Sequence, residues 1–178
     1  EARAFADELQ KTTTYADDVT LSAMALISSM TRLSGDGLNK ATQATADLAS
    51  GLGIDLESAA SLVSKTLSGS MNALGRYGIQ VSGVSGSTER LASLTDNIAE
   101  KFGGRATADT NTFSGGVKQL KNNIDELLEA LGDVENRGAG SYVKALNSMI
   151  IKAKEFLDAT SGKSLIDKGY SEKSLLLL

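Results

Sequence analysis

The side chains of this sequence best placed for chemistry are three neighbouring carboxylates, Asp125, Glu126 and Glu129. Glu126 and Glu129 are three residues apart, so on a helix they would share one surface. A pair of carboxylates can act as general acid and base, or bind a metal ion, where a concave and partly dry site surrounds it. The sequence supplies no His or Cys to complete such a site. We therefore interpret the group as a solvated helix face, and predict no catalytic and no metal-binding residue.

Two glycine-containing segments match parts of nucleotide-binding motifs. Gly162-Lys163-Ser164 has the end of a phosphate-binding loop, but that loop needs a glycine five residues earlier, where Leu157 stands in a helical stripe. Gly51-Leu52-Gly53 lacks the third glycine and the preceding hydrophobic strand of a dinucleotide-binding motif. Both are better explained as helix ends, and we predict no cofactor.

The composition narrows the function further. The 178 residues contain no Cys and no His, which removes thiolate nucleophiles, disulfides and the Ser-His-Asp triad. They also contain no Pro, and aromatic residues make up 4%. A core with so few rings must be built from aliphatic side chains, which suits closely packed helices separated by glycine. We predict an all-α protein that is not an enzyme.

The net charge and the two ends of the sequence indicate which kinds of partner to expect. A formal net charge of −4 argues against a specific nucleic-acid partner, because binding phosphates needs a basic face. No secretory signal and no run of 18 apolar residues is present. The sequence begins at Glu1 and stops within four leucines, which is typical of a fragment, and the final leucines could open an apolar segment.

Apolar residues spaced by three and four predict a bundle of about six to seven helices with glycine-rich connections. We expect Asp36 and Asp55 to cap two of them. A polar linker is predicted from Gly103 to about Asn111, and alternating residues allow a small extended hairpin near 79–86. The predicted helices cover 2–11, about 15–33, Asp36 to Gly51, Asp55 to Gly69, 88–102, Thr112 to about Val134, and the segment from Gly140 through Leu157.

Three of the predicted helices have short apolar faces: Leu38, Ala41, Thr45 and Leu48; Leu56, Ala59, Val63 and Leu67; and Leu91, Leu94, Ile98 and Phe102. Three others carry longer apolar stripes. The last two, joined by a short glycine link, favour an antiparallel hairpin. Their stripes fit either a monomeric core or a seam for coiled-coil-like self-association. The stripes are Tyr15, Val19, Ala23, Leu26, Met30 and Leu33; Phe113, Val117, Leu120, Ile124, Leu127, Leu131 and Val134; and Val143, Leu146, Ile150, Ala153 and Leu157, of which Val143, Leu146, Ile150 and Leu157 are the candidate helix-helix seam.

Several segments of the middle half, taken in order, resemble the tail tape measure proteins of long-tailed bacteriophages and prophages. The most distinctive is Ala-Leu-x-Arg-x-Gly-Ile at Ala73 to Ile79, where Gly75 replaces an expected bulkier residue. The others are Leu48 to Ala60, Lys65 to Asn72, Ile98 to Gly104 with Ala106, Ala108, Asp109 and Thr110, Phe113 to Asn122, and Leu127 to Gly132. The residues that carry the resemblance are Ala73, Leu74, Arg76, Gly78, Ile79, Phe102, Gly103, Phe113, Leu120 and Leu127.

The resemblance implies a structural role in the virion, inside the tail tube or tail tip, in setting tail length during assembly. The resemblance falls in a tape-measure-like domain over 36–136. On helical pattern alone, we also predict an N-terminal helical arm over 1–35 and a C-terminal helix with a truncated tail over 137–178. The implied partners are further copies of the chain as a trimer or hexamer, tail tube and tail-tip or baseplate proteins, and tail assembly chaperones. Membrane contact by the full-length protein is compatible with this role.

Two alternatives remain open. One is a stand-alone helical adaptor whose exposed stripe binds a partner helix. The other is a cell-wall hydrolase domain that uses Glu126 and Glu129, although the missing His and Cys weaken it. A trimer or hexamer in solution would favour the tail protein, whereas a strict monomer would favour the adaptor.

Overall fold

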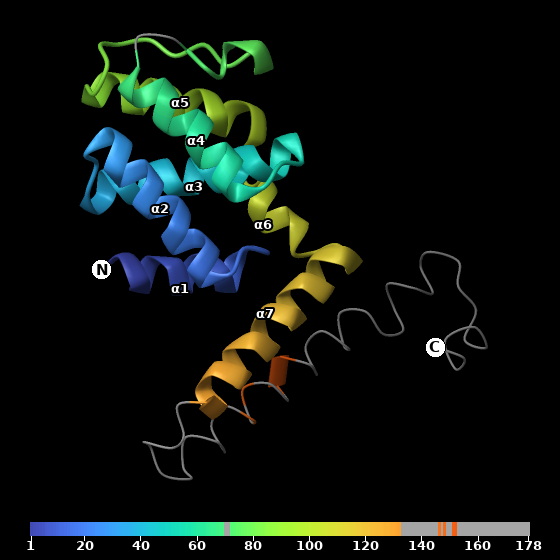
Figure 1. The fold of residues 1–178 in the computed structure, drawn as a ribbon. Coiled ribbons are helices and arrows are strands. Elements are labelled where there is room, and N and C mark those ends of the chain that lie inside the picture. The colour runs from blue at the N-terminus through green and yellow to red at the C-terminus, as the bar shows by residue number, and fades with distance from the viewer. Residues whose placement is uncertain (70–71, 133–145, 147, 149–150, 153–178) are drawn as a thin grey trace, which may run out of the picture. The chain divides into compact units, whose positions relative to one another are not determined.

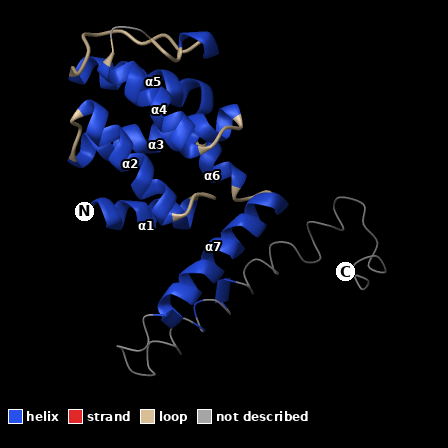
Figure 2. Ribbon diagram, viewed as in Figure 1, coloured by secondary structure: helices blue, strands red, loops and turns tan. Residues whose placement is uncertain are grey.

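A computed structural model describes residues 1–69, 72–132, 146, 148 and 151–152. The described residues are all-α, with six helices packed against one another and no strand, which confirms the predicted fold class (Figures 1 and 2). The elements are α1 (Ala2–Thr12), α2 (Asp17–Thr31), α3 (Gly35–Leu52), α4 (Leu56–Ser68), the 3-10 turn η1 (Gly75–Tyr77), α5 (Thr88–Phe102), α6 (Arg105–Asp109) and α7 (Phe113–Gly132).

The chain divides into two compact units, Glu1–Gly115 and Gly116–Leu178. Residues 1–35, predicted as an N-terminal arm, contribute α1 and α2 to the first unit. The three-part division itself stays a prediction. In the second unit, the predicted last helix is described only at residues 146, 148, 151 and 152, which are helical. None of the helices in the described ranges is long and apolar enough to cross a membrane.

The central element of the first unit is α3, which packs against α1, α2, α4, α5 and α6 (Figure 1). It can have neighbours on so many sides because its buried residues are mostly small. Small side chains let helices approach closely, and the aliphatic neighbours fill the remaining space. The buried residues of α3 are Leu38, Ala41, Thr42, Ala44, Thr45, Ala46, Asp47, Leu48 and Ala49.

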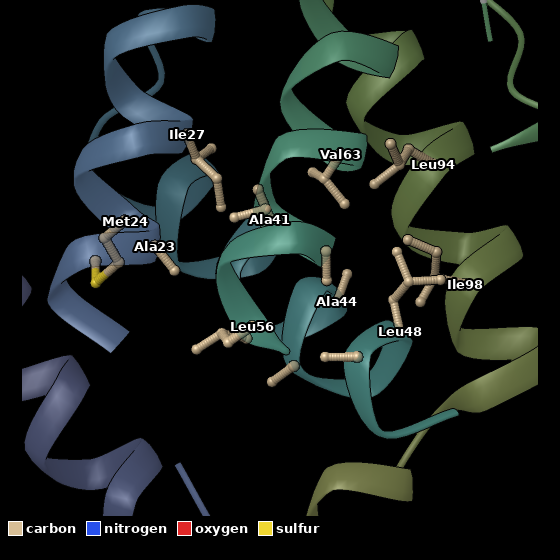
Figure 3. Packing of buried hydrophobic residues seen from close by; sticks show 14 of the residues in the cluster. Ala23, Met24, Ile27, Ala41, Ala44, Leu48, Leu56, Val63, Leu94 and Ile98 are labelled. Atoms are coloured by element: carbon tan, nitrogen blue, oxygen red, sulfur yellow. The ribbon is translucent and has the colours of Figure 1, made fainter. Parts of the chain in front are cut away.

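Aliphatic side chains of α2, α4 and α5 pack against those of α3 in one core, to which α1 and α6 also contribute residues (Figure 3). Ten residues predicted on apolar helix faces lie in this core, as expected: Ala23, Leu38, Ala41, Leu48, Leu56, Ala59, Val63, Leu67, Leu94 and Ile98. The stripe predicted for α2 is partly wrong, because Val19 and Met30 are exposed. The buried face is instead formed by Thr20, Ala23, Met24 and Ile27. Thr20 could join it because its hydroxyl donates to the carbonyl of Ala16 at 2.9 Å, which removes the cost of burying it.

The predicted helix ends are correct in part. Asp55 caps α4 as expected, because its Oδ1 accepts a hydrogen bond from the Ser58 N–H at 2.8 Å. This hydrogen bond lowers the pKa of the Asp55 carboxyl. The predicted cap at Asp36 is wrong. The chain leaves α2 early, at Arg32, which adopts a left-handed conformation, so Ser34 becomes the N-cap of α3 and Asp36 lies in its first turn.

Two connections also differ from prediction. The expected polar linker after Gly104 forms the short helix α6, whose Ala106 is fully buried. The expected hairpin near 79–86 is absent, since residues 72–87 contain η1 followed by chain without strand pairing. Strands are unnecessary there because side chains of α5 bind the backbone of this segment.

Candidate functional site: a clamped loop and an exposed helix face

Residues 72–87, called here the clamped loop, carry the most distinctive part of the family resemblance and lie along α5. Polar side chains spaced along α5 bind the loop backbone at three points, and the loop runs in the opposite direction to the helix. The hydrogen bonds are from Arg90 Nη1 to the Gly83 carbonyl (2.8 Å), from the Ser82 N–H to Ser93 Oγ (3.0 Å), and from Lys101 Nζ to the Gly78 carbonyl (2.5 Å). The loop conformation is therefore held by the first unit itself.

Arg90 is the strongest part of this clamp. Its side chain is buried, with 6% of its surface exposed. Its Nε donates to the carbonyl of Thr66 in the last turn of α4, at 2.6 Å, while Nη1 binds Gly83. A cation is favourable at the carbonyl end of a helix, and each bond satisfies a carbonyl oxygen. Arg90 therefore joins α4, α5 and the loop.

The first half of the loop is a turn closed by Asn72. The Asn72 amide donates to the Ile79 carbonyl at 2.7 Å, and its oxygen accepts from the Leu74 N–H at 3.1 Å. Leu74 and Ile79 are both fully buried. Gly78 has φ of +73°, a left-handed conformation that favours glycine. Three residues of Ala73 to Ile79 thus have structural roles, as two core anchors and one turn residue.

The remaining motif residues of this turn face outward or lie at its edge. Arg76 is exposed, and its guanidinium lies over the ring of Tyr77, 4.8 Å from the centroid. Ala73 is half-buried. At Gly75, where the resemblance leads us to expect a bulkier residue, an added Cβ would lie 3.7 Å from Asn72 Nδ2, an ordinary contact. The turn therefore has room for a side chain at that position.

Phe102 and Gly103, two more motif residues, close the other end of α5. The Phe102 ring lies directly on Gly51, where an added Cβ would come within 2.6 Å of the ring carbon Cγ. Gly51 was predicted only as a helix stop, but α3 continues to Leu52 and ends at Gly53, which has φ of +65°. At Gly103 an added Cβ would lie 2.5 Å from the Ala99 carbonyl oxygen. Gly51 and Gly103 are thus required by close packing.

Sequence reasoning missed Arg90 and Asp47. Asp47 is a buried carboxylate of α3 whose Oδ1 accepts a hydrogen bond from the Ala106 N–H at 3.0 Å, which attaches α6 to α3. Signals for both were present. Arg90 lies four residues before Leu94 on the buried face of α5. Asp47 is the single charged residue between Ala41 and Ala49. A charge in the register of a buried face indicates a partner, but the sequence alone does not identify that partner.

The apolar stripe of α7 differs from these buried contacts. Of the motif residues on α7, Phe113 is 74% exposed, and Leu120 and Leu127 are half-buried. Val117 and Ile124, on the same stripe, are exposed as well. Of the candidate seam residues, Leu146 is exposed, whereas Val143, Ile150 and Leu157 lie outside the described residues.

The residues considered for chemistry are not assembled into a site in the part of the chain that is described. Asp125, Glu126 and Glu129 are all exposed on α7. Among the described residues, no group of three His, Cys, Asp or Glu side chains could hold a metal ion. Gly162, Lys163 and Ser164 lie outside the described residues. The described residues are therefore organised by packing contacts and exposed surfaces.

Comparison with other proteins found no match: the chain matches no protein-family model, no curated protein and no solved structure.

Proposed function

We propose that this chain is a structural segment of a bacteriophage tail tape measure protein, and that its first unit is a folded module and not part of an extended rod. The observation that carries the proposal is the clamped loop. The most distinctive stretch of the resemblance, Ala73 to Ile79, supplies two core anchors and a left-handed glycine. One compact fold therefore explains its residue types, and we expect the resembling proteins to share that fold.

The glycine-separated helices support the second half of the proposal. A continuous helix of 115 residues would extend about 170 Å at 1.5 Å per residue. The first unit, Glu1–Gly115, instead folds its helices around α3. A compact domain of that length is about 35 Å across. Such a module contributes little to the length of a ruler, and its role is to make contacts with other tail proteins.

An in-frame deletion of residues 1–115 in the gene that encodes the chain tests both parts. If tails still assemble, electron microscopy should show a mean tail length reduced by no more than about 35 Å. A reduction of about 170 Å would contradict the folded module and would indicate an extended rod. Loss of all tails would support a role in assembly. In parallel, peptides from this chain should be found in purified tails, and their absence from tails would contradict the tape measure assignment.

The stand-alone adaptor remains a second candidate, favoured by the exposed stripe of α7. An adaptor would act in the host cell and would not be incorporated into particles. The same analysis of purified tails therefore separates the two candidates. Recovery of the chain with host proteins alone would favour the adaptor.

A further inference from the structure

The short helix α6 is docked on α3 through few groups. Its Ala106 side chain is fully buried, and the Ala106 N–H donates to Oδ1 of Asp47, a carboxylate of α3 that is 7% exposed. Among the described residues, every other hydrogen bond of residues 104–112 is made within 104–115. An aspartate and an alanine are therefore the buried groups that hold α6 on α3.

Residues 103–112, called here the connecting segment, lead from α5 into α7 and begin at a pair of glycines. The Phe102 ring lies directly on Gly51, which holds the end of α5 against α3. Gly103 and Gly104 follow at once, and Gly104 has φ of +75°. Because glycine has the widest choice of backbone angles, a change of chain direction is least costly at this point. The chain can therefore turn away from α3 after Phe102 while α5 stays in place.

The helix α6 has little stability of its own. It contains five residues, and a free helix of that length is not stable in water. Arg105, Thr107 and Ala108 are exposed, so packing on α3 stabilises one face alone. Docking also removes most of the Asp47 carboxylate from water, which costs free energy that release of α6 would return. Segments with so few buried contacts open at a lower free energy than the core that carries them.

We propose that α6 is a latch, which opens without unfolding of the bundle formed by α1 to α5. In the docked state, Asp47 holds the connecting segment against α3. In the released state, Asp47 is hydrated, and the roughly ten residues of the segment can span up to about 30 Å at about 3.3 Å per residue. The latch lets α7 move away under load without loss of the core. The proposal does not rest on the tape measure assignment, since it concerns contacts within this chain.

Amide hydrogen exchange of the unaltered full chain, measured by NMR at low concentrations of urea, tests whether α6 opens independently. The Ala106 N–H can exchange only when it leaves Asp47, whereas the Leu48 N–H in the middle of α3 reports unfolding of the bundle. Ala106 should exchange at least tenfold faster than Leu48, at a rate nearly independent of urea, because opening of α6 exposes little surface. Equal rates with equal urea dependence would show that α6 unfolds with the bundle, and would overturn the proposal.

Substitutions at Asp47 test the bond that closes the latch. The chain has no native Cys, so the thiol of Ala106→Cys should react with a maleimide dye only when α6 opens. In that background, Asp47→Ala should raise the labelling rate at least tenfold, because the amide at position 106 loses its charged acceptor. Asp47→Asn keeps an acceptor oxygen and should restore most of the slow labelling. Thr45→Ala is the matched control: Thr45 is also buried in α3, but its hydroxyl binds the Ala41 carbonyl of its own helix, so the rate should not change.

A second buried position separates release of α6 from loss of the whole fold. The thiol of Ala59→Cys, at a fully buried site on α4, should stay slow to react when Asp47→Ala is added. Acceleration by the same factor at both positions would mean that Asp47 supports the entire bundle, and would overturn the proposal. Unchanged labelling of Ala106→Cys would overturn it as well.

Force applied between Ala92→Cys and Lys121→Cys, at exposed positions on α5 and α7, tests the gain in length. Optical tweezers should record a first, reversible lengthening of no more than about 30 Å, followed at higher force by the larger step of bundle unfolding. Asp47→Ala should lower the force of the first step and leave that of the second unchanged. A single unfolding step in the original chain would contradict the latch.

Discussion

The buried faces of the first unit and the α7 stripe of the second (Val117, Leu120, Ile124 and Leu127) have the same pattern of apolar residues but different environments. On α2, Ile27 is fully buried against its neighbours, whereas on α7, Ile124 is 39% exposed. Ile27 lies three residues after Met24 and four after Ala23 on the buried face of α2, and Ile124 lies four residues after Leu120 and three before Leu127 on α7. The difference lies in the neighbours: α2 packs against α1, α3 and α4, whereas Lys152 of the second unit lies beside α7, where its Nζ donates to Asn123 Oδ1. The pattern thus identifies a face, and the surrounding elements decide whether that face is core or surface.

The largest expected effect is a difference in stability loss between substitutions of Ile27 and Ile124. Ile27→Ala should lower the free energy of unfolding by about 3 kcal/mol, because it leaves a cavity in a closely packed core. Ile124→Ala removes the same atoms from an exposed face and should cost less than about 1 kcal/mol at concentrations where the chain is a monomer. Urea denaturation followed by circular dichroism measures both. Equal losses would contradict the distinction between the two regions.

The next largest loss of stability is expected from replacing Arg90. Arg90→Ala should lower the free energy of unfolding by about 2–3 kcal/mol, because the carbonyls of Thr66 and Gly83 lose a buried, charged hydrogen-bond donor. Amide hydrogen exchange should also become faster in residues 78–87. Arg76→Ala, at an exposed site in the same loop, should change stability by less than about 0.5 kcal/mol. Similar stability of the two variants would show that Arg90 does not hold the loop.

Two glycines of α3 should respond with opposite signs. Gly51→Ala should destabilise the chain by about 1–3 kcal/mol, because its methyl group would overlap the Phe102 ring. Gly37→Ala should stabilise it by about 0.5–1 kcal/mol, because an added Cβ there makes ordinary contacts of 3.5 and 3.6 Å and alanine favours helix. Thermal unfolding of the two variants measures the difference. Stabilisation by Gly51→Ala would refute the close contact with Phe102.

The smallest effect concerns the cap of α4. The hydrogen bond from the Ser58 N–H lowers the pKa of Asp55 below its ordinary value of 3.8. The stabilising contribution of the carboxylate is therefore present above that value and is lost as the pH falls through the lowered pKa of the folded state. Asp55→Asn keeps a capping oxygen without the charge. The stability difference between the original chain and this variant should shrink below pH 3.8, and a pH-independent difference would contradict the cap.

Much of the fold was predictable because it follows from local rules. Helical spacing placed the elements, and a capping carboxylate marked the start of α4 at Asp55. Errors arose where a long-range contact decides the outcome. The helix α6 forms where Asp47, 59 residues away, accepts the Ala106 N–H. Thr20 is a different case, because it joins a buried face through a local hydrogen bond to the Ala16 carbonyl, which the spacing of apolar residues does not predict.

The candidate site was less predictable for the same reason. The residues of Ala73 to Ile79 stood out as a motif, yet the hydrogen bond from Lys101 to the Gly78 carbonyl comes from α5, which follows in the sequence. Arg90 could be noticed as a charge on a buried face, but its two carbonyl partners come from different elements. The exposure of the α7 stripe could not be predicted at all, since the same spacing equally suits a core.

The central claim is that the first unit is a folded module in which α3, α4 and α5 end at glycines. Backbone chemical shifts of the full chain, measured by NMR, test it most directly. The account predicts helical shifts that stop between Leu52 and Leu56 and again between Phe102 and Arg105. Uninterrupted helical shifts through Gly53 and through Gly103-Gly104 would indicate an extended rod and would contradict the account.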